Sequence, residues 1–197
     1  MAPLITEALD SAGITSPFPI QEMCIPLALD GQDLIGQAKT GTGKTLGFGV
    51  PLLQRIASDS VAGAIPQALV VVPTRELCVQ VAKDLELAGS RQGTRVLAVY
   101  GGRSYEPQVE ALEKGIEVVV GTPGRLMDLA RQRKLNLSGV KVLVLDEADE
   151  MLDMGFLPDV EAIVGMLPDV RQTLLFSATM PGQIVSLARR YMTSPTH

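Results

Sequence analysis

A glycine-rich run carries the strongest fold signal in this chain: Ala38-Lys39-Thr40-Gly41-Thr42-Gly43-Lys44-Thr45. It follows a short apolar run at residues 33–36 and precedes a segment of helical periodicity that begins near Thr45. Gly41 and Gly43 allow backbone conformations that point several N–H groups inward. The start of a helix adds the positive end of its dipole at the same place. The run therefore predicts a strand, a phosphate-binding loop and a helix in succession.

Two side chains at the end of this run suit the chemistry of a bound triphosphate. Lys44 supplies a point charge for the β- and γ-phosphates, and Thr45 supplies a hydroxyl for Mg²⁺. The alternative is a glycine-rich turn that carries a Lys-Thr pair by chance. The strand before the loop and the helix after it argue against that alternative. Ala38 stands where the general pattern has its first glycine.

A second signal is an apolar run that ends in carboxylates. Residues 142–145 are followed directly by Asp146-Glu147-Ala148-Asp149. Ligands of open α/β sheets bind beyond the carboxyl ends of the strands, so we expect Asp146 to hold Mg²⁺ and Glu147 to orient and deprotonate an attacking water. An acidic helix start is the alternative, because carboxylates favour helix N-termini. The phosphate-binding loop makes the catalytic interpretation the stronger one.

Apolar runs alternate with segments of helical periodicity along the whole chain. The clear runs are residues 68–72, 96–100, 118–120, 142–145 and 173–176, and a weaker one is residues 33–36. Consecutive apolar positions are typical of strands covered on both faces, as in a parallel sheet. The pattern predicts an α/β fold, doubly wound, with helices on both faces of a mostly parallel twisted sheet. The longest stretch of loop-like composition, with Ser, Gly and Pro, is residues 58–66. It is too short for a domain linker, so we expect residues 1–197 to form a single domain.

Composition excludes several classes of function. With 17 Lys and Arg against 22 Asp and Glu, the net charge of −5 argues against a wholly basic nucleic-acid wrapper, although not against a local basic track. Cys24 and Cys78 cannot build a disulfide framework, and the single histidine, His197, makes a His-based metal site or a Ser-His-Asp triad improbable. No apolar run reaches the length of a membrane span and no secretory signal is visible. We therefore expect a soluble cytoplasmic protein.

Taken together, the motifs resemble one family, the DEAD-box ATP-dependent RNA helicases. Residues 146–149 spell the family name, and residues 38–45 match its form of the phosphate loop, which begins with alanine. Further matches follow in the family's order: Gly13-Ile14, Pro17 and Pro19-Ile20-Gln21; Pro73-Thr74-Arg75-Glu76-Leu77; Gly101-Gly102; Thr122-Pro123-Gly124-Arg125; and Ser177-Ala178-Thr179. The resemblance implies the amino-terminal RecA-like domain of such a helicase, a P-loop NTPase fold. It also implies that the Ser-Ala-Thr strand lies between the phosphate-loop strand and the acidic strand.

The resemblance also implies a site for ATP and Mg²⁺. Gln21 is similar to the family's glutamine that hydrogen-bonds the adenine edge, although a buried amide that satisfies its own turn is the alternative. Phe18 stands where the family usually has threonine. The implied nucleotide contacts are Gln21, Ala38, Lys39, Thr40, Gly41, Thr42, Gly43, Lys44 and Thr45, with Thr45 and Asp146 for the metal and Lys44, Asp146 and Glu147 for catalysis.

An RNA-binding surface and a coupling element follow from the same resemblance. Small residues and helix starts after strands let backbone N–H groups approach phosphates, so we expect a sequence-independent grip on the sugar–phosphate backbone. The candidate residues are Pro73, Thr74, Arg75, Gly102, Thr122, Pro123, Gly124 and Arg125. Arg75 and Arg125 would add charge, although one of them could instead pair with an acidic neighbour. Few aromatic residues lie near these loops, so base stacking is expected to be minor. Asp149, Ser177 and Thr179 are expected to form the coupling element.

The family needs a second RecA-like domain, which supplies arginine fingers, and this chain does not contain its motif. We therefore expect an amino-terminal fragment that is monomeric and nearly inactive alone. In the full-length protein it would couple ATP hydrolysis to local RNA unwinding or ribonucleoprotein remodelling. Two alternatives stay open. One is a different P-loop ATPase that acts on protein or DNA, and the other is a non-catalytic RNA- or protein-binding module.

Overall fold

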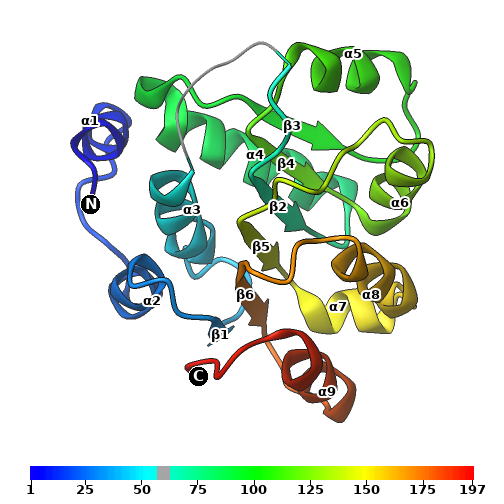
Figure 1. Ribbon diagram of the computed structural model, residues 1–197. Helices are drawn as coiled ribbons and strands as arrows, with labels where there is room; N and C mark the ends of the chain where they lie inside the picture. Colours follow the sequence, from blue (N-terminus) through cyan, green and yellow to red (C-terminus); the bar gives the residue numbers. More distant parts are fainter. Residues whose placement is uncertain (57–62) are drawn as a thin grey trace.

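A computed structural model describes residues 1–56 and 63–197 (Figure 1). Part of the loop predicted at residues 58–66 thus lies outside the described residues. These residues form a six-stranded sheet in which every pair of neighbours is parallel, in the order β1-β6-β5-β2-β4-β3. The strands are β1 (Leu34–Gln37), β2 (Ala68–Val71), β3 (Val96–Val99), β4 (Val118–Gly121), β5 (Val142–Leu145) and β6 (Gln172–Ser177). The predicted α/β fold class is confirmed.

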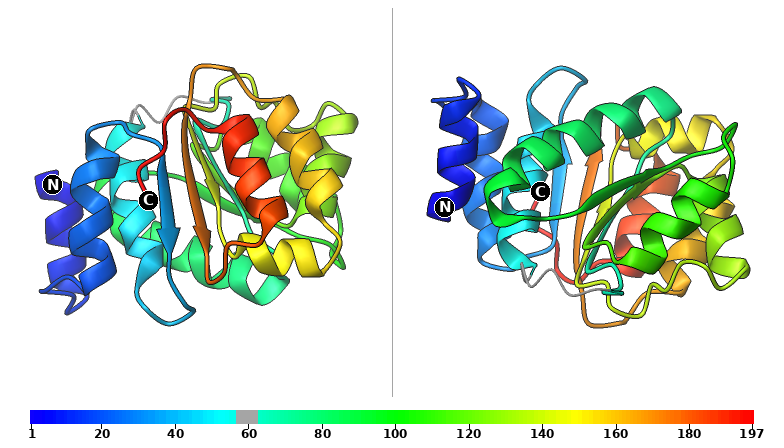
Figure 2. Two further views of the ribbon diagram at one scale, coloured as in Figure 1. Left: turned by 90° about the horizontal axis from the view of Figure 1, so that it is seen from below. Right: turned by 90° about the horizontal axis from the view of Figure 1, so that it is seen from above.

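Helices cover both faces of the sheet. Figure 2 shows the strands lying between these two layers of helices. One core cluster joins the sheet to α1 (Pro3–Ser11), α2 (Pro19–Leu29), α3 (Lys44–Arg55) and α4 (Arg75–Gly89). The other joins it to α5 (Glu106–Lys114), α6 (Pro123–Arg131), α7 (Ala148–Asp153), α8 (Leu157–Gly165) and α9 (Gly182–Tyr191). A short 3₁₀ helix, Ser90–Gln92, follows α4.

The central strands are buried on both faces, as their apolar runs predict. In β2, Ala68 and Val70 belong to the first core cluster, whereas Leu69 and Val71 belong to the second. Alternate side chains of one strand thus enter opposite cores. Within the first cluster the rings of Phe48 and Phe176 pack with their centroids 5.4 Å apart, which joins α3 to β6.

The place of the Ser-Ala-Thr strand is confirmed. The strand β6 pairs with β1 on one side and with β5 on the other, with Gly36 opposite Phe176 and Leu145 opposite Leu175. Because all six strands are parallel, their carboxyl ends meet at one edge of the sheet. The phosphate-binding loop and the acidic segment are thereby brought to neighbouring positions at that edge.

Two helices, α2 and α7, are not predicted by the sequence pattern. In α2 the first residue is Pro19 and an interior residue is Pro26, and proline is normally a helix breaker. The helix α7 has only six residues, too few to show a period. Among the described residues, none of the helices combines the length and apolar character that a bilayer crossing needs.

Candidate nucleotide and nucleic-acid site

The glycine-rich loop connects β1 to α3 through two left-handed glycines. Gly41 has φ 82° and Gly43 has φ 79°, and Gly43 is the residue that precedes the first turn of α3. A Cβ at Gly43 would lie 2.5 Å from a ring carbon of Phe18, whereas a Cβ at Gly41 would meet open space. Two separate reasons therefore favour glycine at position 43: the left-handed backbone conformation and the close approach of the Phe18 ring.

Lys44, the first residue of α3, lies between the two carboxylates that follow β5. Its Nζ is 3.0 Å from Asp146 Oδ1 and 2.6 Å from Glu147 Oε1. The hydroxyl of Thr40 also donates to Glu147 Oε1, at 3.0 Å. The structure therefore brings together residues that are about a hundred positions apart in the sequence, as the parallel sheet predicts.

The charged side chains of this cluster are buried, which disfavours their ionised forms. Lys44 is 4% exposed and Asp146 is fully buried. Burial raises the pKa of Asp146 to about 6, although the neighbouring Lys44 opposes the rise. Burial pushes the pKa of Lys44 down, but the two carboxylates together outweigh it and hold that pKa above its ordinary value. One cation between two carboxylates leaves excess negative charge, which favours binding of a further cation.

The residues of the cluster fit a magnesium ion. Asp146 Oδ2 is buried and has no hydrogen-bond partner in the described part of the chain. Thr45 lines the same cavity as Lys44 and Glu147. Mg²⁺ is usually held by only one or two carboxylates, with waters and substrate phosphates completing its octahedron. A single orphaned carboxylate oxygen suits that mode, and no cluster of three or more metal-ligating side chains exists among the described residues.

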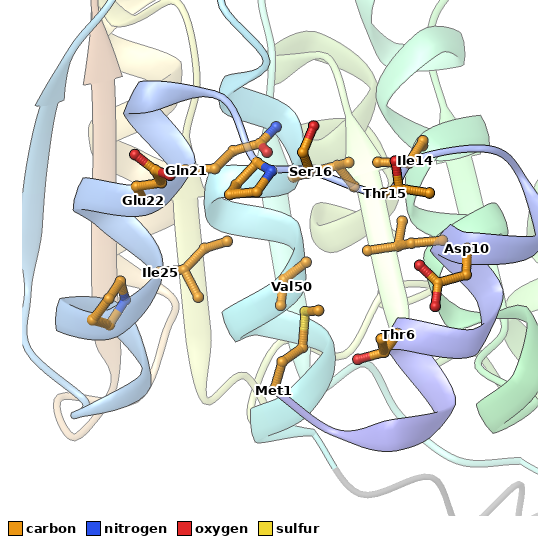
Figure 3. A pocket seen from close by; sticks show the side chains of 14 residues that line it. Met1, Thr6, Asp10, Ile14, Thr15, Ser16, Gln21, Glu22, Ile25 and Val50 are labelled. Atoms are coloured by element: carbon orange, nitrogen blue, oxygen red, sulfur yellow. The ribbon is translucent and has the colours of Figure 1, made fainter.

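A cavity of about 360 Å³ lies over this loop, lined by Phe18, Gln21, Gly41, Lys44, Thr45 and Glu147 among others. A more apolar neighbouring pocket lies between α1, α2 and α3, and Figure 3 shows Gln21, Ile25 and Val50 along its wall. Gln21 and Ile14 line both spaces. Gln21 thus stands at the boundary between the polar cavity above the loop and the apolar pocket beside it.

Gln21 connects the start of α2 to the phosphate-binding loop. Its Oε1 accepts a hydrogen bond from the backbone N–H of Phe18 at 3.0 Å, and its Nε2 donates to the carbonyl of Gly43 at 2.8 Å. A glutamine amide has two donor hydrogens and two acceptor lone pairs. One donor and one acceptor therefore remain after these two bonds. The amide does satisfy its own turn, but it also holds the loop.

The end of β6 is bonded to the start of α7. Asp149 Oδ2 accepts from the backbone N–H of Thr179 at 3.0 Å and from its hydroxyl at 2.8 Å, and Ser177 Oγ accepts from the backbone N–H of Asp149 at 3.1 Å. Burial would raise the pKa of Asp149, but its hydrogen bonds with Thr179, Ser177 and the backbone of Glu150 together outweigh it and hold the pKa below its ordinary value. The three residues expected to couple the two segments are thus in direct contact.

The candidate RNA-binding residues lie at the carboxyl ends of β2, β3 and β4, on the same edge of the sheet. Thr74 precedes α4 and its hydroxyl accepts from the backbone N–H of Leu77 at 3.2 Å, while Thr122 precedes α6. Gly102 has φ 78°. A Cβ at Gly124 would meet no heavy atom within 4 Å, so the backbone at the start of α6 is open to a ligand.

Arg125 does not project from this surface. It is 7% exposed, and its guanidinium donates to Gln108 Oε1 at 3.2 Å and to the carbonyl of Arg103 at 3.0 Å. Its Cζ also lies 4.0 Å from the ring centroid of Tyr105. The guanidinium of Arg125 is thus bonded within the fold, and its contact with RNA remains a prediction. Its partners are an amide and a carbonyl, not the acidic neighbour considered as the alternative.

Three residues that the sequence motifs do not single out lie around the loop between β3 and α5: Tyr100, Arg103 and Tyr105. The guanidinium carbons of Arg75 and Arg103 lie 5.1 Å and 5.7 Å from the ring centroid of Tyr100. Tyr100 and Tyr105 are thus two aromatic residues close to the loop of Gly102, and both contact arginines. The only signal in the sequence is that all three residues flank Gly101-Gly102.

The fold places this chain among the RecA-like phosphate-loop proteins. A family model described as DEAD/DEAH box helicase matches residues 18–187, and the chain belongs to that family. It is 52% identical over 196 residues to the DEAD-box ATP-dependent RNA helicase CshA of Streptococcus pneumoniae, with 100% of this chain and 37% of the relative covered. It is 47% identical over 193 residues to CshA of Bacillus subtilis, with 98% and 38% covered.

Solved structures agree with this assignment. A DEAD box protein from Methanococcus jannaschii matches with a TM-score of 0.93 and 41% identity, over 100% of this chain and 53% of that one. A hypothetical ATP-dependent RNA helicase from Sulfolobus tokodaii matches with a TM-score of 0.91 and 36% identity, over 100% and 56%. The chain thus spans little more than a third of the length of the curated relatives and about half of these solved chains.

Proposed function

We propose that this chain is the ATP-binding domain of an ATP-dependent RNA helicase, and that its phosphate-binding loop and acidic segment together bind ATP and Mg²⁺. The observation that carries the proposal is the position of Lys44 Nζ, between Asp146 and Glu147 at the carboxyl edge of a parallel sheet. Membership of the DEAD/DEAH box family supports it.

Each residue of the cluster has a separate task in this proposal. Lys44 turns from the carboxylates to the β- and γ-phosphates, and Thr45 and Asp146 hold Mg²⁺. An ion held by these two residues would supply positive charge to the phosphate oxygens. Glu147 accepts a proton from the attacking water, and it must first release Lys44 and Thr40, which now donate to its Oε1.

The backbone of the loop and Gln21 provide the remaining nucleotide contacts. Residues 38–43 offer N–H groups to the phosphates. The donor and acceptor that Gln21 has left match the adjacent acceptor and donor of an adenine edge. The same amide donates to the carbonyl of Gly43, so a change in Gln21 on adenine binding would act directly on the phosphate-binding loop.

RNA binding and coupling complete the proposal. The loops after β2, β3 and β4 grip the sugar–phosphate backbone without reading sequence, and Asp149 with Ser177 and Thr179 transmits the state of the ATP site. A second RecA-like domain of the full-length protein supplies arginine fingers, and an arginine finger can be worth about 10³–10⁵ in rate, so this domain alone is nearly inactive. The full-length protein would unwind RNA duplexes locally or remodel ribonucleoproteins in the cytoplasm, and the domain itself would be a monomer.

ATP hydrolysis by the complete natural protein tests the proposal. We expect single-stranded RNA to stimulate phosphate release more than DNA of the same sequence does, and we expect Lys44→Ala to abolish both ATP binding and stimulation. Lys141→Ala is the matched control, because the side chain of Lys141 is exposed and its Nζ donates to Gln67 Oε1, away from the nucleotide cavity. Equal stimulation by DNA, or hydrolysis that survives Lys44→Ala, would contradict the proposal and favour a different P-loop ATPase.

A further inference from the structure

An exposed aromatic ring lies at the rim of the nucleotide cavity, and the proposed function gives it no task. This ring belongs to Phe18, the one aromatic among the described residues that line the cavity with Gln21 and Lys44. Phe18 is 60% exposed, whereas Phe48 and Phe176 are fully buried in the core. A phenyl face that is open to solvent beside a cavity is available for contact with a planar ligand.

Phe18 precedes the first turn of α2, a position where an aromatic side chain is unfavourable. The residues favoured there carry a side-chain oxygen that accepts a hydrogen bond from a backbone N–H of the first turn, and a phenyl ring has no such oxygen. Phe18 thus places a ring where a capping oxygen is usual. Departures from local sequence rules are expected at functional sites.

The ring also lies beside the amide that is proposed to contact adenine. From the point where a Cβ of Gly43 would lie, a ring carbon of Phe18 is 2.5 Å away and Gln21 Nε2 is 2.8 Å away. The backbone N–H of Phe18 donates to Gln21 Oε1, and Gln21 Nε2 donates to the carbonyl of Gly43. The ring, the amide and the phosphate-binding loop therefore form one connected unit, and packing against Gly43 restrains the ring before a ligand binds.

We propose that Phe18 is a nucleotide-binding residue whose ring stacks on the base that Gln21 contacts at its edge. This inference rests on the proposed function, since it requires that a nucleotide binds in this cavity. An aromatic ring stacks on any base, because every base has a π-face. Phe18 therefore supplies affinity for the base, while the hydrogen bonds of Gln21 read its edge.

Calorimetric titration of the complete natural protein with ADP and Mg²⁺ tests the contact. Loss of one stacked ring lowers affinity by about 5- to 100-fold. We expect a loss in this range for Phe18→Ala and an affinity close to that of the wild type for Phe18→Tyr, which keeps the ring. Met23→Ala is the matched control, because Met23 is a 68% exposed apolar residue of the same helix that lies outside the cavity lining.

Inorganic tripolyphosphate separates a contact with the base from an effect on the phosphates. It has no base, so we expect the wild type and Phe18→Ala to bind it with equal affinity, measured by its displacement of bound ADP. A loss of affinity for tripolyphosphate as large as the loss for ADP would show that the ring only supports the phosphate-binding loop, which would overturn the inference.

Phe18→Thr separates the ring from the start of α2. Threonine provides the capping oxygen that phenylalanine lacks, but it has no ring. We therefore expect Phe18→Thr to bind ADP as weakly as Phe18→Ala does. An affinity of Phe18→Thr equal to that of the wild type would show that the helix start matters and the ring does not.

The outcomes distinguish this inference from the proposed function. If the wild-type protein does not bind ADP, the proposed function fails. If it binds, but Phe18→Ala has the same affinity as Met23→Ala, the inference fails while the proposed function stands. Melting temperatures of all variants identify any that do not fold, and Phe18→Thr remains decisive if Phe18→Ala is one of them.

Discussion

At the residue scale, Glu147, the proposed general base, already has hydrogen-bond partners in the phosphate-binding loop and at the start of α3. Glu147 has a left-handed backbone, with φ 53° and ψ 48°, which is rare for a residue with a side chain. Its Oε1 accepts hydrogen bonds from Lys44 and Thr40. Strained conformations of this kind concentrate at functional sites. Here the strained residue lies where the loop and the acidic segment meet.

Replacing this carboxylate should separate binding from hydrolysis. Glu147→Gln removes the charge that competes with phosphates for Lys44, so we expect an ATP analogue to bind several-fold more tightly. We also expect hydrolysis to fall by about 10²–10⁴-fold, because the general base is lost. Fluorescent nucleotide titration and phosphate release measure the two effects. Glu150→Gln, an exposed neighbour, is the control, and normal hydrolysis by Glu147→Gln would show that the base is elsewhere.

Two glycines of the loop provide a matched pair. Gly41 and Gly43 have nearly the same left-handed backbone, so alanine at either should cost about 1–2 kcal/mol. Only at Gly43 would the new Cβ also meet the Phe18 ring, at 2.5 Å. We therefore expect Gly43→Ala to lower the free energy of unfolding more than Gly41→Ala does, by urea titration. Equal losses would mean that the contact with Phe18 is not rigid.

At the scale of elements, the Asp149 carboxylate links the start of α7 to Thr179, just after β6. Thr179→Val removes the hydroxyl bond to Asp149 and should cost about 1 kcal/mol. In the complete protein we expect RNA unwinding to fall further than RNA-stimulated ATP hydrolysis, since the site that binds ATP is untouched. Thr94→Val, at a half-buried threonine before β3, is the control. Parallel loss of both activities would argue against a coupling role.

The same bonds predict a pH dependence. The pKa of Asp149 lies below its ordinary value of 3.8 because Thr179 donates to its carboxylate, against the effect of burial. A lowered pKa contributes stability that is present above the unfolded-state value and is lost as the pH falls through the folded-state value. The stability difference between wild type and Thr179→Val should therefore shrink on acidification below 3.8. A difference that stays constant there would contradict this origin.

The sequence predicts the elements unevenly. The buried strands are evident because β2, β4 and β5 are consecutive apolar runs, whereas α2 is hidden by Pro19 and Pro26. Parallel strands alone place Lys44 and Asp146 at the same edge of the sheet, and their direct contact needs the strand order as well. The strand order follows only from the family resemblance. The burial of Arg125 and the exposure of Arg103 depend on Gln108 and Tyr105, which pack from another element, so no local pattern predicts them.

At the scale of the whole molecule, two cysteines report on the integrity of the core. Cys24 and Cys78 lie in the first core cluster, and burial raises the pKa of both thiols, that of Cys78 to about 12. Raising the pH to the ordinary thiol value of 9.0 should therefore accelerate labelling of the native protein far less than labelling of the urea-unfolded protein. Rapid native labelling of Cys78 would show that the sheet opens there.

The account as a whole depends on where a nucleotide binds. A crystal structure of the complete natural protein with Mg²⁺ and a non-hydrolysable ATP analogue tests this most directly. We predict that Lys44 Nζ leaves Glu147 and contacts the terminal phosphates, with Asp146 on the side of the metal ion. An analogue bound elsewhere, with the bonds from Lys44 to Asp146 and Glu147 intact, would contradict the account.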